Sequence, residues 1–253
     1  MHRRDSWSPW NRGLAACFVL LLTLPAARPS NIVEGAGTAP VRSAQTPTSA
    51  WANYSTGDDV VALARDPATG GLVAATTGGA VFWATDGTHA KVTAADGLCA
   101  NWLTDVAVAA DGEAWFATID GGLCGRDALG RWHHLNPTTP GPLERETALW
   151  AVAADADGWW ASGGLGALLL LENGRWTRQS LPEPLAGADV DDLAVAPDGS
   201  LWVVASSDGA LAARRSRDGR WRVWSQADGL PAAAQERRLA VDVSGDVWIG
   251  PLN

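Results

Sequence analysis

Aromatic residues other than tryptophan are scarce in this chain. It has one tyrosine and three phenylalanines against fifteen tryptophans among 253 residues, and only one methionine and three cysteines. Such uneven use of one residue type indicates a short motif copied many times. Hydrophobic residues make up 47% of the chain, enough for a well-buried core in one large domain or two small ones.

Positive charge is also limited, since the formal net charge is −9. Removing residues 1–27 takes away three arginines and one aspartate and brings the charge to about −11. Nucleic acids and anionic lipid surfaces need clustered Lys and Arg. We therefore expect neither as a partner, which leaves an unknown small molecule, a glycan or a protein.

The sequence has no apolar run long enough for a comfortable membrane span, which needs roughly 20 residues. Its longest run, 14–24, follows a basic start and precedes Pro25-Ala26-Ala27, as in a secretory signal peptide. We predict a signal at 1–27 with an uncleaved anchor as the alternative, and we interpret Cys17 as part of the apolar segment. Residues 28–50 read as a flexible linker rich in Ser, Thr, Pro and Ala. The protein is therefore expected to be exported, to the periplasm or beyond, with no other membrane span.

Catalytic signatures are missing as well: Gly-x-Ser-x-Gly, His-Glu-x-x-His and a glycine-rich phosphate loop do not occur. Asp155 with Asp157, or Asp189 with Asp191 and Asp192, could offer oxygens to calcium. However, the first pair belongs to a repeated turn whose carboxylates hold the turn itself. We predict no catalytic residue, no metal site and no cofactor.

Two tryptophan anchors repeat from position 51 onward. The first follows an Asp/Gly turn, with valine at 73 in its weakest copy, and its tryptophans are Trp115, Trp160, Trp202 and Trp248. The second follows Gly-Arg at Trp132, Trp176 and Trp221, with His89 in the same slot as a packing substitute. The two anchors share a spacing of 42 to 46 residues, so the chain is a tandem repeat.

Each repeat resolves into four short strands separated by turn signals. In the second repeat we expect strands at 103–109, 113–118, 122–127 and 132–136. Four strands in about 43 residues is the pattern of a propeller blade. The sequence thus predicts an all-β propeller at 51–253, with four full units at about 60–94, 103–136, 149–181 and 190–226 and a partial unit at 238–250. The first-anchor tryptophans should lie buried in second strands, and the second-anchor tryptophans should begin fourth strands.

The stretch from Trp221 to Gly250 carries Asp228-Gly229-Leu230-Pro231 and then a strand ending before Gly245-Asp246-Val247-Trp248. This pattern resembles the two-component regulator propeller repeats, and residues 92–115 resemble them too. The third unit departs from it, because 181–189 lacks Asp-Gly-Leu. The resemblance implies an extracytoplasmic input domain, joined in the family to a membrane helix and an output domain.

The blade-joining loops give the remaining candidates. Trp102 and Trp150 border them and could stack on sugar rings. Cys99 and Cys124 fall in one unit, either as two buried thiols or as a disulfide, which an exported chain permits. His133 and His134 are adjacent in a strand, so their side chains point to opposite faces.

The leading hypothesis is therefore a sensing or ligand-binding module. The alternatives are a propeller-type lyase or hydrolase, for which Glu144, Arg145 and Asp189 are the best candidates, and a protein-binding scaffold. The unit count suggests a truncated part of a longer protein. We expect a ring that is incomplete, in which Trp51–Ser55 does not complete the sheet begun by 238–250.

Overall fold

The computed structural model describes residues 59–135, 142, 148–156, 158–206, 211–230 and 237–251. Within them the fold is built from antiparallel strands, with two short 3₁₀ turns at Ala94–Asp96 and Gln226–Asp228. The expected signal peptide and linker, and the segment Trp51–Ser55, lie outside the described residues.

In the described part of the chain, eighteen strands form four four-stranded sheets and one two-stranded sheet, each in plain meander order. Blade 1 holds β1 (Val60–Arg65), β2 (Leu72–Thr76), β3 (Gly79–Trp83) and β4 (His89–Val92). Blade 2 holds β5 (Leu103–Val108), β6 (Ala114–Thr118), β7 (Leu123–Arg126) and β8 (Trp132–Leu135). Blade 3 holds β9 (Leu149–Ala154), β10 (Gly158–Gly163), β11 (Leu168–Glu172) and β12 (Arg175–Arg178). Blade 4 holds β13 (Asp189–Val195), β14 (Leu201–Ser206), β15 (Leu211–Arg215) and β16 (Trp221–Trp224), and the partial blade 5 holds β17 (Arg237–Val241) and β18 (Val247–Pro251).

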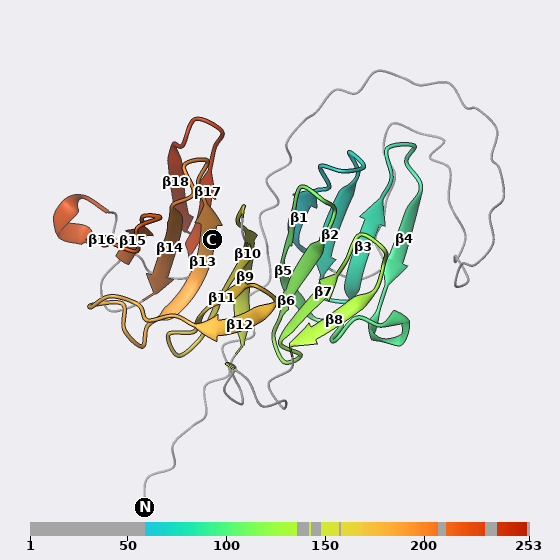
Figure 1. Ribbon diagram of the computed structural model, residues 1–253, viewed down its shortest axis with the longest axis horizontal. Helices are drawn as coiled ribbons and strands as arrows, with labels where there is room; N and C mark the ends of the chain where they lie inside the picture. Colours follow the sequence, from blue (N-terminus) through green and yellow to red (C-terminus); the bar gives the residue numbers. More distant parts are fainter. Residues whose placement is uncertain are drawn as a thin grey trace, which may run out of the picture.

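The predicted propeller architecture is confirmed. The first strands of consecutive blades contact one another, β1 with β5, β5 with β9, β9 with β13 and β13 with β17. The sheets follow in chain order across the molecule, from blade 1 on the right of the view to blade 4 on the left (Figure 1). Among the described residues, no extensive contact joins blade 1 to blade 5, so these blades form an open arc.

The hydrophobic core lies between blades and not within them. One cluster, for example, joins Trp115 and Leu123 of blade 2 to Leu149, Trp159 and Leu169 of blade 3. The other three fill the spaces between blades 1 and 2, blades 3 and 4, and blades 4 and 5. Each sheet is therefore stabilised mainly by packing against the adjacent blades, as in other repeat proteins.

The first-anchor tryptophans all lie in second strands, in one register. Each faces an alanine of its own first strand: Ala107 opposite Trp115, Ala153 opposite Trp160, Ala194 opposite Trp202 and Ala240 opposite Trp248. A small residue at that place leaves room for the indole above the sheet. Trp115 and Trp160 are buried and Trp202 is half-buried, but Trp248 is 66% exposed. The expectation of burial was thus wrong for Trp248, because among the described residues no sheet covers its face of blade 5.

The second-anchor tryptophans also keep one register. Trp132 and Trp221 begin β8 and β16, and Trp176 is the second residue of β12. Each packs toward the preceding blade: Trp132 into the cluster between blades 1 and 2, Trp176 into the next and Trp221 into the one after. Trp176 lies edge-on against Trp115, with ring centroids 5.3 Å apart.

The Asp-Gly-Leu motif forms a capped turn. In blade 1, the backbone N–H of Thr93 donates to Asp96 Oδ2 at 3.0 Å, and Gly97 takes the left-handed conformation with φ 108°. A Cβ at Gly97 would lie 2.6 Å from the Trp132 ring, so glycine is needed for space as well. Leu98 then enters the cluster between blades 1 and 2. The third blade lacks the motif, yet its loop supplies a buried leucine, Leu185, to the cluster between blades 3 and 4.

Candidate functional site

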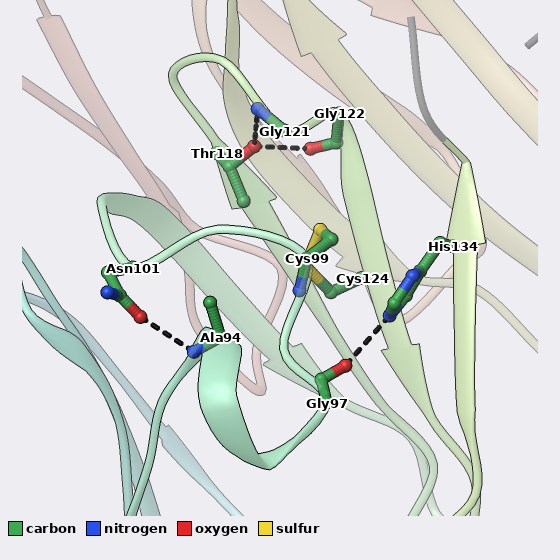
Figure 2. Close-up of a disulfide and its surroundings, with 9 residues drawn as sticks. All are labelled: Ala94, Gly97, Cys99, Asn101, Thr118, Gly121, Gly122, Cys124 and His134. Atoms are coloured by element: carbon green, nitrogen blue, oxygen red, sulfur yellow. Dashed lines mark hydrogen bonds between the residues drawn. A yellow bond between two sulfur atoms is a disulfide. The ribbon is translucent and has the colours of Figure 1, made fainter. Parts of the chain in front are cut away.

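The loops that join blades gather at one end of the sheets, where first strands begin. The loop between blades 1 and 2 is firmly held there (Figure 2). Cys99 is joined to Cys124 of β7 by a disulfide with a Cα–Cα distance of 5.6 Å. The Ala94 N–H donates to Asn101 Oδ1 at 2.7 Å, and His134 Nε2 lies 2.8 Å from the Gly97 carbonyl. This loop carries Trp102, which is 46% exposed.

The two predicted ligand-binding tryptophans hold different positions in their repeats. Trp102 precedes β5 of blade 2, whereas Trp150 is the second residue of β9 and lies at a bulge opposite β10. The position of Trp150 in blade 2 is taken by Thr104, whose hydroxyl donates to the Leu149 carbonyl of the next blade at 2.7 Å. The side chain at this position of blade 2 therefore reaches toward blade 3.

Trp150 lies beside Asp189 of blade 4, with Gly164 between them. A Cβ built on Gly164 would stand 3.5 Å from Asp189 Oδ1 and 4.0 Å from Trp150 Nε1. Asp189 Oδ1 also accepts the Leu165 N–H at 2.8 Å, which fixes the carboxylate against the 163–167 turn. The Trp150 indole N–H and the exposed Asp189 carboxylate thus both lie within contact distance of the Cβ position of the half-buried Gly164.

A second group of polar residues lines the first strands. Asp105 Oδ2 accepts the Val152 N–H of the next blade at 2.8 Å, and Asp192 Oδ2 accepts the Leu239 N–H of the next blade at 2.8 Å. Arg238 occupies the same register position in blade 5 that Asp105 and Asp192 occupy in blades 2 and 4. We call Asp105, Asp192 and Arg238 the axial layer.

The axial carboxylates hold protons more tightly than free aspartates do. Burial, then the negative charge of Asp192, raises the pKa of Asp105 to about 7, against the opposing hydrogen bonds from Val152 and Val106. Burial likewise raises the pKa of Asp192 to about 6, with the Leu239 hydrogen bond and the Arg238 charge acting the other way. Because the two groups interact, they titrate as a pair.

A surface cleft lies at the opposite end of the sheets, where first strands turn into second strands. It has a volume of about 340 Å³ and is lined by turn residues of blades 3, 4 and 5, among them Asp155, Arg217 and Asp242. An adjoining cleft of about 210 Å³ adds Trp160, Glu172 and Arg215. The sequence predicts ligand binding only at the other end of the sheets.

The remaining candidates have structural partners. His133 Nε2 lies 3.6 Å from Asp127 Oδ2, while its neighbour His134 contacts Gly97, as expected for opposite faces. The His89 ring packs at 6.0 Å from Trp83.

The turns between the first and second strands of blades 2 and 4 are held by carboxylates of the turns themselves. Asp111 and Asp198 each accept a backbone N–H two residues on, at 3.0 and 2.9 Å. In the described part of the chain no three His, Cys, Asp or Glu side chains gather as metal ligands would. Asp157, Glu144 and Arg145 lie outside the described residues.

No known protein family matches the chain by its sequence profile, and no curated protein matches it by sequence search. Solved structures do share its fold. The extracellular domain of the protein named as hybrid two-component system BT4673 from B. thetaiotaomicron superposes with a TM-score of 0.61 at 13% identity, over 82% of this chain and 27% of that one. The extracellular domain named for hybrid two-component system BT3049 from the same organism gives 0.55 at 16% identity, over 82% and 34%.

A gluconolactonase from Xanthomonas campestris, XC5397, gives a TM-score of 0.52 at 15% identity, over 73% of this chain and 66% of that one. The chain spans about a quarter to a third of the two extracellular domains. The resemblance to regulator propellers is confirmed at the level of the fold. No helix in the described part of the chain is long and apolar enough to cross a bilayer.

The roles of three residues were not predicted from the sequence: Asp105, Arg238 and Glu113. The register contained the signal for the first two, since Asp105, Asp192 and Arg238 each precede their anchor tryptophan by ten positions. Glu113 accepts the indole N–H of Trp115 at 3.0 Å and that of Trp159 at 3.2 Å, so it links blades 2 and 3. No feature of the repeat sequence indicates this role of Glu113.

Proposed function

We propose that the protein is a non-catalytic, extracytoplasmic sensory module that binds a small polar ligand, of the saccharide type, at the Trp150–Gly164–Asp189 point of the loop face. The observation that carries the proposal is that an indole N–H and an exposed carboxylate lie beside the same half-buried glycine, which has no side chain of its own. An aromatic face with a few fixed polar groups suits a sugar ring. The fold shared with extracellular domains of two-component sensors supports the sensory role.

The disulfide-held loop between blades 1 and 2 lies at the same end of the sheets and supports this face as the binding face. Trp102 is presented on a loop that a covalent bond and two hydrogen bonds fix in place. A preorganised aromatic loses little freedom when a ligand binds, which favours affinity. Trp102 is therefore proposed as a secondary contact.

The test is a thermal-shift screen of the purified protein against mono- and oligosaccharides, followed by calorimetry on any hit. Trp150→Ala should lower affinity by up to about tenfold, since stacking on an aromatic ring contributes about 0.5–1.5 kcal/mol. Gly164→Leu should block the site by filling it. Arg217→Ala, in the cleft at the opposite end, should leave binding unchanged. Binding lost in the Arg217 variant and kept in the Trp150 variant would move the site to that cleft.

A catalytic role is the second candidate, because the gluconolactonase shares the fold. Catalysis would require a charged group beside the bound substrate. Asp189 is the described charged residue at the proposed site. Incubating the protein with any saccharide or lactone that binds should give no product above the Asp189→Asn variant. Turnover that disappears in that variant would replace the sensory proposal with an enzymatic one.

We also propose that the chain is part of a longer protein with further blades. The small share of the sensor domains that it spans and the uncovered face of blade 5 support this. Sequencing the coding region beyond the codon for Asn253 tests it: an in-frame continuation encoding more Asp-Gly-Leu repeats is expected, and a stop codon would refute it.

A further inference from the structure

A polar cleft lies between blades 3 and 4, at the end of the sheets opposite the loop face. It has a volume of about 210 Å³ and joins the cleft of about 340 Å³ through three shared lining residues, Asp155, Gly199 and Arg217. Both sheets that form it have four strands, so it belongs to a complete blade-to-blade interface. Pockets for drug-sized ligands measure about 300–1,000 Å³, and this cleft therefore suits a smaller molecule.

Blade 4 contributes two guanidinium groups to this cleft, Arg215 and Arg217. Arg215 ends β15 and lies over the Trp160 ring of blade 3, 5.4 Å from its centroid. Arg217 Nε donates to the Asp198 carbonyl at 3.0 Å, and its guanidinium lies so close to Gly199 that a Cβ there would collide with it. In the described part of the chain neither arginine makes an ion pair. Both guanidiniums are thus held in place by uncharged groups.

The repeat itself does not need an arginine at position 217. The turn between β15 and β16 has the same backbone hydrogen bonds as the corresponding turns of blades 1 and 2. Those turns carry Thr85 and Ala128 at the place of Arg217. In blade 1 the Thr85 side chain lies against the turn glycine Gly70, so a short side chain is enough for packing. The charge of Arg217 therefore exceeds what the turn requires.

Blade 3 contributes two carboxylates to the same cleft, Asp155 and Glu172. Asp155 follows β9, and its Oδ2 accepts the Trp160 indole N–H at 3.4 Å. Glu172 ends β11 and is exposed. No ion pair joins either of these described carboxylates to the two guanidiniums. The cleft thus carries two positive groups from blade 4 and two negative groups from blade 3, which do not neutralise one another by direct contact.

We propose that this cleft binds a small zwitterion of the α-amino acid class. The ligand carboxylate lies on the two guanidiniums of blade 4, and its ammonium group lies on the two carboxylates of blade 3. Guanidiniums bind carboxylates through charge-assisted, often bidentate hydrogen bonds, and an ammonium group has three N–H donors for carboxylate oxygens. The balance of charge favours a neutral zwitterion, because a dianion or a dication would face two groups of its own sign.

The adjoining cleft receives the side chain of this ligand. Its lining includes apolar turn residues of blades 4 and 5, among them Val195, Pro197 and Val241. An apolar side chain loses contact with water there, which favours binding. We therefore expect an amino acid with an apolar side chain. This site lies at the end of the sheets opposite the proposed saccharide site and is independent of it.

Isothermal titration calorimetry of the full chain with L-leucine and the other apolar L-amino acids, one at a time, tests the proposal. Isocaproate, which is leucine without its amino group, and isoamylamine, which is leucine without its carboxylate, are the matched probes. Leucine should bind at least about tenfold more tightly than either, because each analogue leaves one pair of charged side chains without a partner. Isocaproate or isoamylamine binding as tightly as leucine would overturn the proposal, as would the absence of binding by every apolar amino acid.

Three single substitutions locate the site. Arg217→Ala and Glu172→Gln, on opposite sides of the cleft, should each weaken amino-acid binding by about tenfold or more. Both side chains are exposed, so circular dichroism should show unchanged folding. Arg220→Ala is the matched control and should bind like the wild type, because Arg220 is an exposed arginine of the same turn that pairs with Asp218 at 3.3 Å, outside the cleft lining. Full affinity in either cleft variant, or lost affinity in the Arg220 variant, would refute the assignment of the amino acid to this cleft.

Discussion

The free energy of unfolding of this protein should fall as the pH rises from 5 to 7. Aspartates in folded proteins usually have the opposite effect, because their pKa values are usually lowered by folding. Asp105 has a folded-state pKa of about 7 and Asp192 one of about 6, both above the ordinary value of 3.8. The folded state therefore binds protons that the unfolded chain has already released. A raised carboxyl pKa adds stability at low pH that is lost as the pH rises through the folded-state value.

The magnitude follows from the shifts. Each carboxylate contributes about 1.4 kcal/mol per pH unit while it is protonated only in the folded state. From pH 5 to pH 7 this gives at most about 4 kcal/mol, some 3 from Asp105 and 1 from Asp192. Exchange of Asp105 for asparagine removes the titrating group, so the variant should lose most of the slope between pH 5 and pH 7.

Urea unfolding at constant ionic strength, followed by tryptophan fluorescence at pH 5, 6, 7 and 8, measures this dependence. Asp127→Asn serves as the control, because the pKa of Asp127 is shifted in the opposite direction. Hydrogen bonding to the Arg131 backbone holds the pKa of Asp127 at about 2, so its removal should weaken the protein at neutral pH and bring no gain at pH 8. A wild-type stability that is flat or rises from pH 5 to 7 would contradict the reasoning.

Three further predictions concern packing. Gly125→Ala should cost about 1–3 kcal/mol, because a Cβ there would lie 2.5 Å from the Trp115 ring; chemical unfolding measures it. Trp160→Ala should lower the free energy of unfolding by about 3–5 kcal/mol, because Trp160 is buried. Trp248→Ala should lower it by under about 1 kcal/mol, because Trp248 is mostly exposed. Reduction of the blade 2 disulfide, which spans 25 residues, should lower stability by about 3 kcal/mol, seen as a lower melting temperature in reductant.

The fold could be predicted because its determinants are local and repeated. Turn residues, strand lengths and the anchor tryptophans recur at one period, and a blade is specified within about 43 residues. Each end of the strands expected in the second unit either coincides with the observed strand end or differs from it by one residue. The third blade was also identified without its Asp-Gly-Leu turn, because its two tryptophan anchors keep the register.

The burial of individual tryptophans could not be predicted in the same way. Trp202 and Trp248 follow the same motif, yet one is half-buried and the other is exposed. Burial depends on the neighbouring sheet, and blade 5 has two described strands where the others have four. The candidate site was predicted in part: Trp150 and Asp189 were named separately, but only the fold shows that Gly164 brings them together.

The alternation of aspartate and alanine at the axial position has a hydrogen-bonding explanation. The bulges in the first strands displace their N–H groups from the regular ladder. Asp192 accepts the Leu193 N–H at 2.8 Å with one oxygen and the Leu239 N–H of blade 5 with the other. One carboxylate thereby satisfies two blades, and Asp105 does the same for Val106 and Val152. Blade 3 can therefore carry Ala151 at this position, because the carboxylates of blades 2 and 4 already satisfy the neighbouring donors.

Asp192→Ala tests this explanation directly. It should leave two buried N–H groups without acceptors, at a cost of about 1–3 kcal/mol each. Asp192→Asn keeps one acceptor oxygen and should lose less. Amide hydrogen exchange locates the effect: the Leu193 and Leu239 amides should lose protection in the alanine variant, while Val152, whose acceptor is Asp105, should keep its own. Unchanged protection at Leu239 in a variant that is otherwise folded would show that the carboxylate does not join blades 4 and 5.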